Sequence, residues 1–160
     1  MGLIYLDACI LIYAIEEHPV WAGVVRAALK NEPDARFAVS PLVKMECLVK
    51  PLKTGDIAMQ HRYEAGLNEF VQLPMVEAIF LQAAMLRARF GLKSPDALHL
   101  ACAQHHGCDA LWTNGERLAV AGHGLARDVL KQADLAHAQA VEGTLGERPK
   151  KKGEKAFKNL

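Results

Sequence analysis

The 160-residue sequence has no apolar run approaching the roughly 20 residues that a membrane helix needs. Its N-terminus begins with a strand-like run, whereas a secretory signal starts with a basic region followed by an apolar one. It also has no Cys-x-x-Cys pair, and its four cysteines stand among apolar neighbours, which predicts reduced thiols in the core. These absences, with 51% apolar residues, predict one cytoplasmic domain with a sizeable core.

Several motifs of common enzyme classes are also missing. The chain has no Gly-x-x-x-x-Gly-Lys-Ser/Thr loop for phosphates and no Gly-x-Ser-x-Gly turn for a nucleophilic serine. The segment "GHGLAR" lacks the third glycine and the preceding strand of a dinucleotide fingerprint. An aspartyl-phosphate phosphatase has a second Asp two residues after the first, and here Cys9 stands at that position after Asp7. These absences argue against nucleotide-binding, serine-hydrolase and phosphatase chemistry.

Charge is distributed unevenly along the chain, although the formal net charge is +1. Residues 147–160 carry six of the 19 Lys and Arg residues but two of the 18 Asp and Glu residues, so the rest is mildly acidic. From about residue 131 the sequence loses aromatic and β-branched residues. We therefore expect one domain over residues 1–130, followed over 131–160 by a helical extension and a basic, flexible tail.

Short apolar segments alternate with segments of helical periodicity. This pattern predicts an α/β fold of three layers, α/β/α, in which helices cover both faces of a central parallel sheet of four or five strands. Ser40 and Ser94 each precede a proline at a helix start, so they are expected to be N-caps. The expected strands are 3–6, 36–39, 70–73, 110–112 and a last one within 125–130. The expected helices are 8–17, 19–31, 41–49, 57–69, 76–90, 95–106 and 116–121.

Three acids stand where apolar residues are expected. Asp7 follows an apolar strand, at the carboxyl end where open parallel sheets bind ligands, and a helix N-cap is its alternative role. Glu46 lies beside the apolar stripe of its helix, so it either reaches out to solvent or belongs to a site. Asp96 is in the first turn of an apolar helix, where the helix dipole alone favours an acid by about 0.3–1 kcal/mol.

The positions of these acids allow them to converge on one crevice at the strand ends. Two carboxylates about 5 Å apart repel by roughly 3 kcal/mol at an effective dielectric of 20, so several together must take up protons or a cation. Mg²⁺ or Mn²⁺ is the cofactor that such oxygen ligands favour. A zinc site is the alternative, but its spacing matches no usual ligand pattern. Its residues would be His99, Cys102, His105, His106 and Cys108.

Four motifs stand out along the chain: "IYLDACILIYAIE", "SPLVKMECLV", "LKSPDALHLACA" and "ALWTNGERL". In order and spacing they resemble the PIN-domain family, in particular the VapC-type toxins of bacterial toxin–antitoxin pairs. The resemblance covers residues 2–130 and implies a PIN-like fold whose acidic pocket binds Mg²⁺ or Mn²⁺ and cuts single-stranded RNA. It also implies that Asp7, Glu46 and Asp96 are the first three acids of the site and that Thr113 is its hydroxyl residue.

The chain departs from the family pattern at the fourth acid, where Gly115 stands two residues after Thr113. Glu116 is a candidate to reach the metal instead, and Asn114 is a candidate to take part through water. The segment "TNG" also predicts a tight turn in which glycine supplies a positive φ. Loss of the fourth carboxylate would weaken the hold on a second metal or its water.

The sequence therefore predicts a metal-dependent ribonuclease in which Asp7, Glu46 and Asp96 hold an ion that activates water against an RNA phosphodiester. The alternative is a catalytically weakened PIN domain that binds RNA or a protein without efficient cleavage. The resemblance further implies a small antitoxin partner and a homodimer, for which the apolar segment 76–91 is either the dimer surface or a core helix. Candidate contacts to RNA phosphates are Lys44, Lys50, Lys53, Arg87, Arg89 and Lys93.

Overall fold

Five parallel strands form one central sheet in a computed structural model that describes residues 2–131. The strands are β1 (Leu3–Leu6), β2 (Arg36–Val39), β3 (Val71–Gln72), β4 (Ala110–Thr113) and β5 (Ala126–Asp128). Their order is β3-β2-β1-β4-β5, and every neighbouring pair is parallel. The expected α/β class is thereby confirmed.

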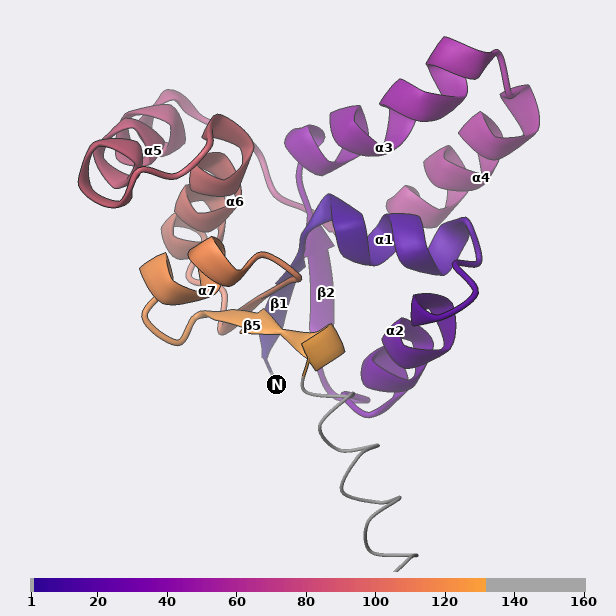
Figure 1. Ribbon diagram of the computed structural model, residues 1–160, viewed down its shortest axis with the longest axis horizontal. Helices are drawn as coiled ribbons and strands as arrows, with labels where there is room; N and C mark the ends of the chain where they lie inside the picture. Colours follow the sequence, from indigo (N-terminus) through magenta and orange to yellow (C-terminus); the bar gives the residue numbers. More distant parts are fainter. Residues whose placement is uncertain (1, 132–160) are drawn as a thin grey trace, which may run out of the picture.

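Helices flank the sheet. They are α1 (Ala8–Ile15), α2 (Trp21–Lys30), α3 (Pro41–Thr54), α4 (Ile57–Asn68), α5 (Glu77–Phe90), α6 (Ser94–His105) and α7 (Glu116–Ala121). In the view of Figure 1, α5, α6 and α7 lie on one side of the sheet and α1 to α4 on the other. None of the helices within the described part of the chain is both long and apolar enough to cross a membrane.

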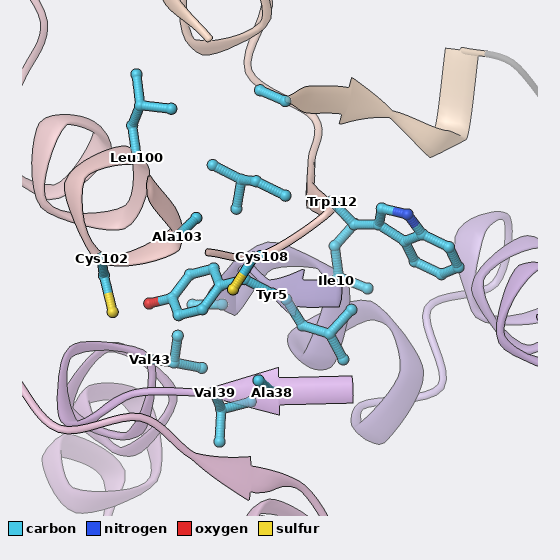
Figure 2. Close-up of a cluster of buried hydrophobic side chains, with 14 of the residues drawn as sticks. Tyr5, Ile10, Ala38, Val39, Val43, Leu100, Cys102, Ala103, Cys108 and Trp112 are labelled. Carbon is cyan, nitrogen blue, oxygen red and sulfur yellow. The ribbon is translucent and has the colours of Figure 1, made fainter. Parts of the chain in front are cut away.

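β1 is the centre of the sheet, because the chain adds β2 and β3 on one side of it and then β4 and β5 on the other. Ile4, Tyr5 and Leu6 are buried, as expected for a strand covered on both faces. The labelled side chains in Figure 2 show this core, with Tyr5 between residues of β2, α3 and α6. In open α/β sheets the crevice at such a change of strand order, here between β1 and β4, is where ligands bind.

Helix α3 extends beyond the expected end at Val49, because Pro51 lies inside it and does not break it. A proline in a helix removes one backbone hydrogen bond and usually costs about 3 kcal/mol. Here Pro51 is buried, and the helix ends at Thr54. The φ of 70° at the following Gly55 turns the chain so that the N–H of Asp56 donates to the Pro51 carbonyl at 2.9 Å. The expectation of a shorter helix was wrong because tertiary burial compensates for the lost bond.

The two serines expected as N-caps do not cap with their side chains. Ser40 occupies the N-cap position of α3, but its buried hydroxyl bonds the Tyr5 hydroxyl at 2.6 Å. Ser94 is already the first residue of α6, and Lys93 is at the cap. The strand expected at 70–73 is reduced to Val71 and Gln72 at the edge of the sheet. Apart from Lys131, the predicted extension lies outside the described residues.

Candidate functional site

Three side chains from distant parts of the chain meet at the carboxyl end of β1. Asp7 follows β1, Glu46 lies on α3, and His99 lies on α6. Within residues 2–131, they form a group whose ligand atoms all lie within 4.8 Å of one another. The structure thus brings together two of the three predicted acids. Asp96 stays outside this group, one turn before His99 on α6.

Asp7 is held by the neighbouring strand. Its backbone N–H donates to the Trp112 carbonyl at 3.0 Å, which continues the β1–β4 pairing by one residue. Thr113 at the end of β4 donates its hydroxyl hydrogen to Asp7 Oδ2 at 2.7 Å, and Asp7 Oδ1 lies 3.5 Å from His99 Nε2. Asp7 occupies the N-cap position of α1 but makes no side-chain cap bond, so the simple capping role is wrong.

Glu46 turns into the group rather than out to solvent. Its side chain is 26% exposed, and its Oε2 lies 2.8 Å from His99 Nε2. An ionised carboxylate has no hydrogen to donate, so Nε2 carries the hydrogen and donates it to Glu46. Of the two roles expected for Glu46, the structure therefore favours membership of the site.

A buried hydrogen-bond chain supports His99 from behind. His99 Nδ1 lies 2.9 Å from the Tyr5 hydroxyl, which in turn lies 2.6 Å from Ser40 Oγ. All three side chains are buried, and no buried side-chain N or O atom of the described residues lacks a partner. Burial is the main cause that raises the pKa of Tyr5, so its phenol keeps its hydrogen.

The electrostatics of the site favour a cation. Burial raises the pKa of Asp96, and the charge of Asp7 raises it further, against weaker opposition from His99 and Lys93. Burial alone would lower the pKa of His99, but the hydrogen bond to Glu46 and the surrounding carboxylate charges outweigh it and raise the pKa. Protons are thus favoured on Asp96 by burial and by the charge of Asp7, and on His99 by the surrounding carboxylates.

The donor set fits a divalent metal ion. Two carboxylates and an imidazole nitrogen face one another, and a third carboxylate is one helical turn away. The alternative zinc site is not formed among the described residues, where the acid and histidine group is the one that qualifies. Cys102 and Cys108 are buried free thiols, and His106 Nε2 bonds the Pro74 carbonyl.

Gly115 does not form the expected turn with a positive φ. Its φ is −87°, and it occupies the N-cap position of α7 with its N–H donating to Thr113 Oγ1 at 3.2 Å. Glu116 is 81% exposed and pairs with Lys131 at 3.2 Å. Asn114 donates its amide hydrogen to the Tyr13 hydroxyl. The structure therefore brings neither of the two proposed replacements into the group.

A family model described as "PIN domain" matches residues 4–124, which include Asp7, Glu46, Asp96 and Thr113. The chain belongs to the PIN domain family. This range contains all four motifs identified in the sequence, and the all-parallel sheet flanked by helices is consistent with a PIN-like fold. A search among curated proteins found no match.

Solved structures similar to this PIN domain include proteins of toxin–antitoxin systems. A toxin–antitoxin complex from Klebsiella pneumoniae has 26% identity and a TM-score of 0.65, covering 79% of this chain and 97% of the other. VapBC2 from Rickettsia felis, bound to a promoter DNA fragment, has 17% identity and a TM-score of 0.67, with coverages of 78% and 97%. Mycobacterium tuberculosis VapC20, described as a sarcin–ricin loop cleaving toxin, has 14% identity and a TM-score of 0.65, with coverages of 74% and 95%.

His99 is the member of this PIN domain site that the sequence analysis missed as a partner of the acids. The cysteines near it in the sequence suggest a zinc ligand instead. The signal that could have found it is its spacing, because residues three apart share one face of a helix and His99 is three residues after Asp96.

Proposed function

We propose that this PIN domain is a Mg²⁺- or Mn²⁺-dependent endoribonuclease that cleaves single-stranded RNA and acts as the toxin of a toxin–antitoxin pair. The observation that carries the proposal is the meeting of Asp7 and Glu46 at the change of strand order, in a chain that belongs to a nuclease family. The similarity to toxin–antitoxin structures supports the toxin role, and the description of VapC20 supports RNA as the class of substrate.

Each residue of the site has a distinct task in this proposal. Asp7 and Glu46 would hold the ion, and Asp96 adds negative charge one turn away. When bound, the ion lowers the pKa of a water molecule and neutralises charge on the phosphate. Thr113 donates a hydrogen bond to Asp7 Oδ2, so the Asp7 carboxylate is held in one orientation toward the group.

RNA must be held by bases outside the acidic group, because the carboxylates repel phosphates. Lys93 is placed best for this, since it stands at the N-cap of α6 and is near enough for its charge to lower the pKa of Asp96. Lys44 is exposed on α3, two residues before Glu46. Lys50 is engaged with Glu16, and Arg87 donates to the Leu92 carbonyl, so these two are weaker candidates.

A homodimer and an antitoxin are the partners in this proposal. Helix α5 carries apolar side chains that are at least half exposed, namely Phe80, Leu81 and Met85, while its Ile79 and Ala83 are buried. It lies at the outer edge of the molecule in Figure 1. This exposure favours the dimer surface over the alternative of a core helix. An antitoxin segment would cover the acidic group and so block the RNA.

A catalytically weakened domain is the second candidate function. It is favoured by one observation, that Gly115 replaces the fourth acid while Glu116 and Asn114 are engaged elsewhere. Such a protein would bind RNA or a partner through the same surface without efficient cleavage.

A cleavage assay separates the two functions. Purified protein is incubated with labelled single-stranded RNA, and with DNA of the same sequence, with Mn²⁺, with Mg²⁺ or with a chelator. We expect Mn²⁺-dependent cleavage of the RNA, leaving 5′-phosphates, that is lost in Asp7→Asn and in Glu46→Gln. Full activity in Asp7→Asn or in chelator would contradict the mechanism. Inactive protein that still binds the RNA would favour the second function.

A further inference from the structure

The imidazole of His99 occupies a position that is unusual for a structural side chain. It is 1% exposed, yet its Nε2 points between two carboxylates at the strand ends. A buried polar group is usually hydrogen-bonded within the protein. In His99, Nδ1 bonds the buried Tyr5 hydroxyl, whereas Nε2 is turned to the carboxylates of the site.

We propose that His99 is a ligand of the metal ion and supplies a nitrogen donor beside the oxygens of Asp7 and Glu46. The inference rests on the metal-dependent function proposed above. It adds His99 to the predicted ligands Asp7 and Glu46, with Asp96 as a further carboxylate one helical turn away.

The distances within the group are close to those between ligand atoms around one metal ion. His99 Nε2 is 2.8 Å from Glu46 Oε2 and 3.5 Å from Asp7 Oδ1. Adjacent ligand atoms around one ion with bonds of about 2.1 Å are about 3 Å apart. The three atoms can therefore share one ion with small movements, in which the ion replaces the hydrogen that Nε2 donates to Glu46.

The hydrogen-bond chain behind the ring also fits a metal-bound histidine. A histidine that binds a metal through Nε2 keeps its hydrogen on Nδ1 and donates it to a supporting group. In the hydrogen-bond chain behind His99, Nδ1 would donate to the Tyr5 oxygen at 2.9 Å, and the Tyr5 hydroxyl would donate to Ser40 Oγ at 2.6 Å. The hydrogens of His99 Nδ1 and of the Tyr5 hydroxyl then each have an acceptor, so the ligand form of the ring fits the existing distances of this chain.

The elements that carry this support are the rigid ones of the fold. Tyr5 belongs to the central strand, Ser40 directly follows β2 at the N-cap of α3, and the side chains of Tyr5, Ser40 and His99 are buried. A donor fixed on such elements favours one coordination geometry. Mg²⁺ is a hard cation that takes oxygen ligands and keeps several waters, whereas Mn²⁺ belongs to the first-row series that also binds nitrogen ligands. The site should therefore prefer Mn²⁺ to Mg²⁺ more strongly than a site of carboxylates alone.

Pulsed EPR of the full-length protein loaded with Mn²⁺ tests the assignment. We expect modulation from a directly bound ¹⁴N nucleus, replaced by the ¹⁵N pattern when the protein is produced with ¹⁵N-histidine. The modulation should disappear in His99→Gln, while the affinity for Mn²⁺ measured by calorimetry falls about 10- to 100-fold and that for Mg²⁺ falls less. His61→Gln, at an exposed position of α4, is the matched control and should change neither readout.

A second variant guards against failure of His99→Gln to fold. Tyr5→Phe retains the ring of His99 and its neighbours, so the nitrogen modulation should persist while Mn²⁺ affinity falls. Mn²⁺ that binds without nitrogen modulation, or with modulation that persists in folded His99→Gln, would overturn the role of His99 and leave the proposed function intact. Absence of Mn²⁺ binding altogether would overturn both.

Discussion

The hydroxyl of Thr113 donates a hydrogen bond of 2.7 Å to Asp7 Oδ2, and this bond joins residues that are 106 positions apart in the sequence. Thr113 is the last residue of β4 and Asp7 directly follows β1, the neighbouring parallel strand, at the place where the strand order reverses. The bond is buried on the threonine side, since Thr113 is 1% exposed. It therefore fixes one oxygen of Asp7 and leaves the other facing Glu46 and His99.

Thr113→Val removes this bond and keeps the shape of the side chain. We expect metal affinity or RNA cleavage to fall about 10- to 100-fold, because residues that orient a ligand typically contribute that much. Thr113→Ser keeps a hydroxyl and should retain most of the activity. Calorimetry with Mn²⁺ and the cleavage assay measure the effect, and equal values for Thr113→Val and the native protein would show that Asp7 needs no such support.

Gly115→Asp restores the carboxylate that the family pattern has at this position. A side chain fits, because a Cβ at Gly115 would lie 3.5 Å from Thr113 Oγ1 and from Leu118 Cβ, and the φ of −87° suits any residue. We expect RNA cleavage to rise about tenfold or more, since another carboxylate strengthens the hold on metal and water. Gly115→Asn, of similar shape without charge, is the control. An equal gain in both variants would contradict an electrostatic cause.

Glu16 connects the end of α1 to α3 and α4, through Lys50 and Tyr63. Burial alone would raise the pKa of Glu16, but these two hydrogen bonds and the charge of Lys50 lower it below the ordinary value of 4.5. Because the pKa is lower in the folded state, the ionised group stabilises the protein above about pH 4.5. That stabilisation is lost as the pH falls through the lowered value.

Glu16→Gln should therefore reduce the free energy of unfolding by about 1 kcal/mol at pH 7, and this difference should fade below pH 4. Urea denaturation at several pH values measures it. The neighbouring Glu17→Gln is the matched control and should change stability little, because the pair of Glu17 with Arg26 is exposed. A difference that grows toward low pH would contradict the assigned direction of the pKa.

The buried cysteines should be unreactive in the folded protein. Burial raises the pKa of Cys47 and of Cys102 to about 12 and that of Cys108 to about 11. The thiolate is the nucleophile, and at pH 8 only about a thousandth or less of each cysteine is thiolate, so alkylation is slow. Alkylation followed by mass spectrometry should label these residues slowly in buffer and rapidly in urea. Fast labelling of Cys102 in buffer would contradict the core described here.

Local chemistry predicted much of the fold. The strands at 3–6 and 36–39 have the expected bounds, because short apolar runs between helical segments can be satisfied only inside a parallel sheet covered on both faces. Errors arose where burial overrides a local preference. Pro51 continues a helix because its ring is buried, and Ser40 bonds Tyr5 rather than its own helix because the two hydroxyls meet in the core.

The sequence by itself determined the α/β class and the family motifs, and it singled out Asp7 and Glu46 as candidate site residues, since acids in apolar segments need a partner. Only the tertiary structure decided that His99 rather than Asp96 completes the close group, and that Glu116 and Asn114 turn elsewhere. The reason is physical, because residues 7, 46 and 99 belong to separate elements. The distances between their side chains depend on how β1, α3 and α6 pack, which no local pattern specifies.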